Sequence, residues 1–105
     1  MPDDQQVVLD LNNPFFQEGL FALPKAEKLA ALDAMRKIRS MTWPEMYRDR
    51  GLRWEKIVSV KPPSGIPAIY SLRITRSCRA TAFREGHVLH FLTITADHDA
   101  AYGQK

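Results

Sequence analysis

Four arginines interrupt a stretch of alternating apolar and polar residues in the last third of the chain. The stretch, IYSLRITRSCRATAFREGHVLHFLTIT, covers residues 69–95 and carries Arg73, Arg76, Arg79 and Arg84. Guanidinium groups bind phosphate oxygens through paired hydrogen bonds, and exposed aromatic rings stack on unpaired bases. These residue types therefore indicate either a basic surface for a phosphate-bearing ligand or ordinary solvated charges.

The alternation of side chains along a strand assigns these residues to the two faces of a predicted sheet. The face expected against helices carries Leu72, Ile74, Cys78, Ala80 and Ala82. The other face is expected to be open and to carry Arg73, Arg79, Thr81, Phe83 and Phe91. Parity with Ile94 places His90 on the helix-facing side. Arg76 and Arg84 fall at strand ends, where we expect them to be solvated.

The preceding sequence predicts the elements that position this sheet. We expect a first strand at residues 7–11 and a turn-rich segment at 12–19, whose Phe15 and Phe16 fold back onto the core. A helix is predicted over residues 24–40, and a capping box at Thr42 and Glu45 begins a second helix that ends near Gly51. Further strands are expected over 52–60, 68–75, 78–83 and 87–95. This order predicts an α+β fold: an N-terminal strand, a helical hairpin and a curved, mainly antiparallel sheet.

Composition is that of an ordinary globular protein, with 45% hydrophobic and 26% charged residues among 105, so we expect a single domain over residues 1–105. No apolar run approaches the roughly 18 residues of a membrane span. The acidic start lacks a secretion signal, which predicts a cytoplasmic protein with no membrane partner. The single cysteine, Cys78, and three scattered histidines predict no disulfide, no metal site and no cofactor. We interpret Cys78 as a small buried residue rather than a nucleophile.

Basic residues are concentrated in the body of the chain. Residues 1–24 contain four acidic and no basic side chains, whereas residues 25–96 contain 14 basic and 6 acidic ones. Such a surplus suits phosphate-bearing or acidic partners, although solvated surface charge would give the same count. Arg36, Lys37 and Arg39 crowd the end of the first predicted helix, where the helix dipole favours cations. They are candidate RNA contacts, or else a solvated helix end.

The succession of segments in the last third resembles that of the RelE/ParE superfamily of toxin–antitoxin proteins. The matching segments are YSLRI, CRATAF, VLHFLTIT and the closing HDAAY, and the resemblance extends over residues 7–102. It implies a compact fold in which a first strand, a helical hairpin and a curved antiparallel sheet follow one another. It also implies a cognate antitoxin as partner.

In the RelE-like branch, the resemblance implies a ribosome-dependent endoribonuclease that cuts messenger RNA by attack of a 2′-hydroxyl on the adjacent phosphate. Carried over by position, Arg79 would hold the scissile phosphate and Arg73 would add a second cation. Tyr102 would stack on a base or assist proton transfer, and His98 would serve as general acid or base. Besides the helix-end bases, Thr81 and Phe83 on the open face are candidate RNA contacts.

The chain also departs from the RelE-like pattern, and the departures support other functions. Ser71 stands where a lysine is common, and Ala96, Asp97 and Asp99 occupy a region where the family often carries another base. These differences favour a protein of the same fold without RNA cleavage, such as a ParE-like toxin of DNA gyrase or an inactive binding module. A third hypothesis is a protein that binds nucleic acid non-specifically. The sequence leaves the oligomeric state open.

Overall fold

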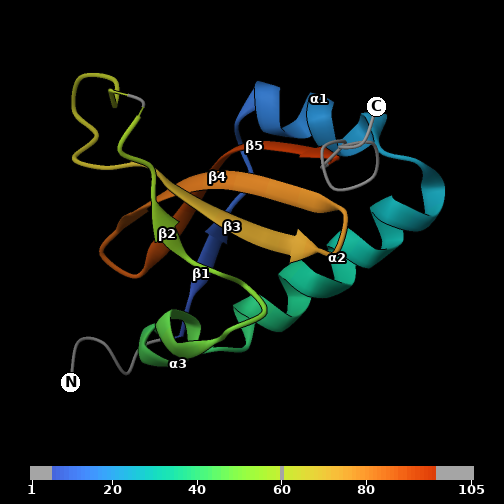
Figure 1. The fold of residues 1–105 in the computed structure, drawn as a ribbon, viewed down its shortest axis with the longest axis horizontal. Coiled ribbons are helices and arrows are strands. Elements are labelled where there is room, and N and C mark those ends of the chain that lie inside the picture. Colours follow the sequence, from blue (N-terminus) through green and yellow to red (C-terminus); the bar gives the residue numbers. More distant parts are fainter. Residues whose placement is uncertain (1–5, 60, 97–105) are drawn as a thin grey trace.

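The computed structural model describes residues 6–59 and 61–96 (Figure 1). The elements follow in the order β1 (Val8–Asp10), α1 (Pro14–Ala22), α2 (Lys25–Arg39), α3 (Trp43–Arg48), β2 (Glu55–Lys56), β3 (Tyr70–Thr75), β4 (Cys78–Glu85) and β5 (Val88–Ala96). The strands form one sheet in the order β1-β5-β4-β3-β2, antiparallel except for the parallel pair β1 and β5. The predicted α+β class is confirmed, although the long strand expected over 52–60 is reduced to the two residues of β2.

Helix α1 occupies the segment for which the sequence predicted a turn, and that prediction was wrong. Asn13 caps the helix by accepting hydrogen bonds from the amides of Phe15 and Phe16, and Pro14 occupies the first turn. Phe16 is fully buried but Phe15 is 74% exposed, so only one of the two rings folds onto the core. The helical hairpin therefore consists of α1 and α2, one element earlier than predicted.

Helix α1 lies directly on strand β5. At Gly19, a Cβ atom would come within 2.3 Å of the carbonyl oxygen of Ile94, closer than any side chain allows. Beside this contact, Phe16 packs against Phe91 of β5 with ring centroids 5.0 Å apart. Glycine thus sets how closely the first helix approaches the sheet.

One carboxylate of helix α2 forms hydrogen bonds with side chains at the turn between β3 and β4. Glu27, in its first turn, accepts hydrogen bonds from Ser77 Oγ at 2.5 Å, Cys78 Sγ at 3.3 Å and Thr75 Oγ1 at 3.4 Å. The bonds from Ser77 and then Cys78 hold the pKa of Glu27 below its ordinary value of 4.5. Burial raises the pKa of the Cys78 thiol, in keeping with its predicted place in the core.

The Glu27 carboxylate should make stability depend on pH. A lowered pKa in the folded state stabilises the fold above the carboxyl's unfolded pKa, and that contribution is lost as pH falls through the folded value. We therefore expect the urea midpoint of the wild type to fall more steeply between about pH 5 and about pH 3 than that of Glu27→Gln. Glu18→Gln, at an exposed position on α1, is the matched control. Equal slopes for the wild type and Glu27→Gln would contradict this role.

Helix α3 begins at the predicted capping box, with Thr42 and Glu45 bonded reciprocally. Trp43, the first residue of this helix, is fully buried. Arg84 lies 4.2 Å from the Trp43 ring centroid and donates hydrogen bonds to Tyr47 Oη and the Gly86 carbonyl. The prediction of a solvated strand-end Arg84 was wrong, because β4 places this side chain on the core face against α3.

Candidate nucleic-acid interface

The two arginines with the strongest sequence case stand side by side. Arg73 of β3 and Arg79 of β4 are direct cross-strand partners. Leu72 and Ala80, their neighbours along the strands, are buried in the core, so both arginines belong to the opposite, open face. Directly opposed side chains have Cβ atoms about 5 Å apart, and like charges at that separation repel.

A row of hydroxyl groups lies next to the arginine pair on the open face. Ser71 faces Thr81 across the strands, and Thr81 faces Thr93. The hydroxyl oxygens of Thr81 and Thr93 are 2.7 Å apart and share a hydrogen bond. Thr81 is two residues beyond Arg79, or about 7 Å along the strand. The face thus offers hydroxyl groups next to the arginine pair.

Beyond the hydroxyl row, an aromatic pair occupies the same face. Phe83 stacks on His90 with ring centroids 4.6 Å apart and an interplanar angle of 12°. This arrangement corrects two predictions, because Phe91 is buried in the core whereas His90 lies on the open face. The cause is a register shift between Thr81 and Ala82, where Leu92 is an extra residue in β5. Such a bulge exchanges the faces of all residues on one side of it.

His90 also joins two carboxylates, a cluster that the sequence analysis missed. Its Nδ1 lies 2.7 Å from Asp10 Oδ2 and its Nε2 lies 3.1 Å from Glu85 Oε1. Carboxylates only accept hydrogen bonds, so both contacts form together when both ring nitrogens carry protons. The Asn12 amide and then His90 lower the pKa of Asp10. The apolar residues Leu89, Phe91 and Ile94 break strict alternation in the sequence. This break was the available signal that His90 lies on the open face.

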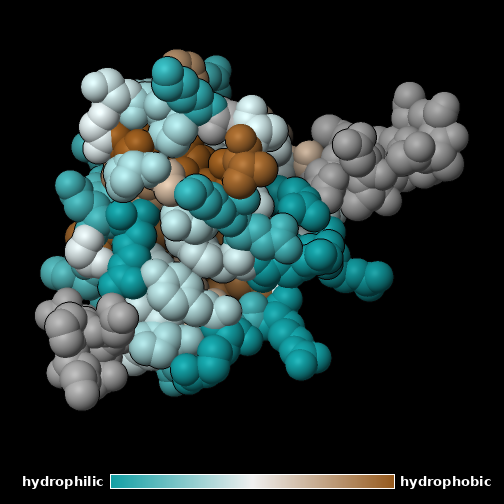
Figure 2. Space-filling view, turned by 60° about the vertical axis from the view of Figure 1, so that its left-hand side comes forward, coloured by the Kyte–Doolittle hydropathy of each residue, from teal (hydrophilic) through white to brown (hydrophobic). Residues whose placement is uncertain are grey.

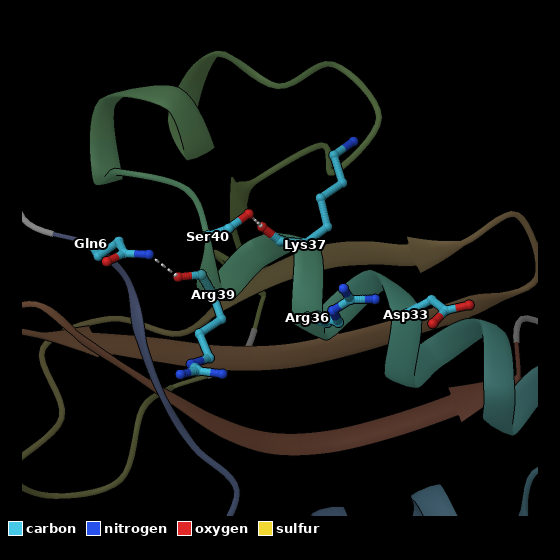
Figure 3. Close-up of a pocket in the computed structure, with 6 residues that line it drawn as sticks. All are labelled: Gln6, Asp33, Arg36, Lys37, Arg39 and Ser40. Atoms are coloured by element: carbon cyan, nitrogen blue, oxygen red, sulfur yellow. Dashed lines mark hydrogen bonds between the residues drawn. The ribbon is translucent and has the colours of Figure 1, made fainter.

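The basic residues at the end of α2 form a separate region. Arg36, Lys37 and Arg39 line a hollow of about 620 Å³ together with Gln6, Asp33 and Ser40 (Figure 3). Figure 3 shows Lys37 and Arg39 pointing away from each other, so the charges do not converge on one point. Because α2 covers the core face of the sheet, Arg36 and Arg39 lie apart from the Arg73–Arg79 pair, whereas Lys37 also lines a second hollow together with Arg73. The candidate RNA contacts therefore do not form one continuous group.

The other predicted site residues, His98 and Tyr102, lie outside the described residues. Within residues 6–59 and 61–96, no group of three or more His, Cys, Asp or Glu side chains is arranged to hold a metal ion. None of the helices described is both long and apolar enough to cross a membrane. On the face drawn in Figure 2, hydrophilic side chains predominate and the hydrophobic ones gather in the upper half.

Comparison with known proteins identifies the fold. No family model matches the chain, and no curated protein sequence matches it. Among solved structures, the crystal structure of the archaeal RelE–RelB complex from Pyrococcus horikoshii is similar, with a TM-score of 0.57 and 18% sequence identity. The match covers 90% of this chain and 96% of the other. The chain therefore has a RelE-like fold, which confirms the architecture predicted from the sequence.

Proposed function

We propose that this protein is the toxin of a type II toxin–antitoxin pair and that it cleaves messenger RNA on the ribosome in the cytoplasm. The observation that carries the proposal is the direct opposition of Arg73 and Arg79 on the open face of a RelE-like sheet. The similar structure is a complex of RelE with RelB, which supports an antitoxin as the partner of this chain.

In the proposed reaction, the 2′-hydroxyl oxygen forms a bond to the adjacent phosphorus while the bond from phosphorus to the 5′-oxygen breaks. The 2′-hydroxyl loses its proton and the departing 5′-oxygen gains one, which leaves a cyclic phosphate. Arg73 and Arg79 would offset the charge that builds on the phosphate oxygens. We assign the two proton transfers to His98 and Tyr102. Thr81 and Phe83 would contact the sugar and base of a neighbouring nucleotide.

A toxin without RNA cleavage, such as one directed at DNA gyrase, is the second candidate. Ser71, directly opposite Thr81, supports it because the row next to the arginine pair gains a hydroxyl where RelE-like members commonly have a lysine. With fewer cations, the open face would stabilise a phosphorane less well. It would still bind a partner surface.

Expression of the chain alone in a bacterial host separates these candidates. Under the nuclease hypothesis, growth stops and transcripts are cut within their coding regions only while they are being translated. Co-expression of an antitoxin encoded by a neighbouring reading frame should restore growth. Growth arrest with intact transcripts and blocked DNA replication would instead support the gyrase-directed candidate. Uninterrupted growth with intact transcripts would contradict both.

A further inference from the structure

A second hollow, of about 360 Å³, lies at the outer edge of β3, between α2 and the loop that follows α3. It exists because β2 is very short: its two residues pair only with Tyr70 and Ser71. Beyond them, the loop approaches β3 through a single backbone hydrogen bond from the Arg73 amide to the Leu52 carbonyl, 2.6 Å long. The rest of this edge stays open to a ligand.

Charges around this hollow favour an anion. Lys37, Arg73 and Arg76 line it, against one acidic residue, Asp49. The Asp49 carboxylate is already engaged, because it accepts a hydrogen bond from the Leu52 amide at 3.0 Å and lies 3.7 Å from Lys37 Nζ. Three cations and one carboxylate leave a surplus of positive charge around the hollow. The exposed Arg76 adds a guanidinium at its rim.

One of the residues that line the hollow has a buried donor without an acceptor. The Nε atom of Arg73 is buried and has no hydrogen-bond partner among the described residues. Buried polar groups are almost always paired, because an unpaired donor loses its bond to water without replacement. A guanidinium group at a positively charged hollow is suited to an anionic oxygen as its partner.

We propose that this hollow binds a phosphate group through Arg73 and Arg76, with Lys37 as the third cation. Its volume exceeds that of a phosphate ion and leaves room for an attached sugar. Because Arg73 also stands opposite Arg79, the hollow adjoins the open face, and an RNA strand crossing the edge of β3 would place its next phosphate there. That RNA source rests on the proposed function, whereas binding of phosphate itself does not.

Inorganic phosphate tests the site without RNA. In nitrogen-15 NMR spectra of the full chain, phosphate should shift the amide signals of Gly51, Leu52 and Thr75, which line the hollow. Arg76→Gln should weaken this binding by roughly tenfold, since it removes one charged hydrogen-bonding group. Arg48→Gln, an exposed arginine of α3 outside the lining, should bind as the wild type does. Unchanged binding in Arg76→Gln, or an equal loss in both variants, would overturn the proposal.

An RNA oligonucleotide with methylated 2′-hydroxyls, which cannot be cleaved by 2′-attack, identifies the source of the phosphate. If the hollow holds a backbone phosphate, Arg76→Gln should reduce the slope of log affinity against log salt by about 0.7. If the slope is unchanged while inorganic phosphate binds more weakly, the ligand is a free phosphate compound and the RNA path is refuted. Cleavage of RNA by the wild type is measured in a separate assay. Loss of cleavage would contradict the proposed function, whereas only the binding measurements test the phosphate site.

Discussion

Replacing Arg79 with alanine is expected to abolish RNA cleavage, with a loss of at least about 100-fold in rate. Arg79 occupies the middle of the open face, beside Arg73 on one side and across from Thr95 on the other. In the proposed reaction, a guanidinium in this position would contact the phosphate where negative charge grows. Its removal therefore raises the energy of the transition state more than that of bound RNA, and the catalytic rate should fall further than the affinity.

The measurement is cleavage of a translated messenger RNA by purified protein on ribosomes, together with growth of cells expressing each variant. Arg79→Lys should retain part of the activity, because lysine keeps the charge but cannot form the paired hydrogen bonds of a guanidinium. Arg48→Ala, at an exposed position on α3, should cleave at the wild-type rate. If Arg79→Ala cleaves RNA normally, the arginine pair is not the reaction site and the nuclease proposal fails with it.

The strands β3 and β4 were predictable because strict alternation holds along most of their length. Parity alone placed Arg73, Arg79, Thr81 and Phe83 on one face, and the observed register puts them there. The same rule failed in β5, where Leu92 is inserted and His90 exchanges faces with Phe91. A bulge depends on how two strands pair, so alternation within one strand does not reveal it.

Helix α1 was missed because its residues are ambiguous between a turn and a helix start. Asparagine followed by proline is common in turns, yet the same pair serves as N-cap and first helical residue at Asn13 and Pro14. Gly19, in the interior of the helix, further lowers the intrinsic helix propensity. The glycine is accounted for only by the close approach of α1 to β5, which is a tertiary contact.

The hollow at the edge of β3 could not be predicted from the sequence either. Lys37 and Arg76 are far apart along the chain, and they meet because β2 ends after two residues and leaves the edge of β3 uncovered. The sequence favoured a long strand over residues 52–60, which would have closed that edge. Local pattern therefore identified the cations, whereas the contacts between elements decide which of them face a common space.

Gly19→Ala is expected to destabilise the fold by about 2 kcal/mol or more, the range found for overpacked positions. In an isolated helix the change would be favourable by about 0.8–1.0 kcal/mol. Here the new Cβ would lie 2.3 Å from the Ile94 carbonyl oxygen, which belongs to the backbone of β5 and cannot rotate away. Helix α1 must move off the sheet, and this separates Phe16 from Phe91. Urea unfolding followed by circular dichroism measures the difference.

Gly51→Ala provides the matched control, because the same methyl group is added where the nearest atom is Asp49 Oδ1 at 3.2 Å. That oxygen ends a side chain and can shift by a few tenths of an ångström, which weakens its hydrogen bond from the Leu52 amide, so we expect a loss of at most about 1 kcal/mol. If Gly19→Ala is as stable as Gly51→Ala, helix α1 is not held at the observed distance from β5. A stabilised Gly19→Ala would mean that helix propensity outweighs the contact, and the close packing of the helical hairpin on the sheet would have to be abandoned.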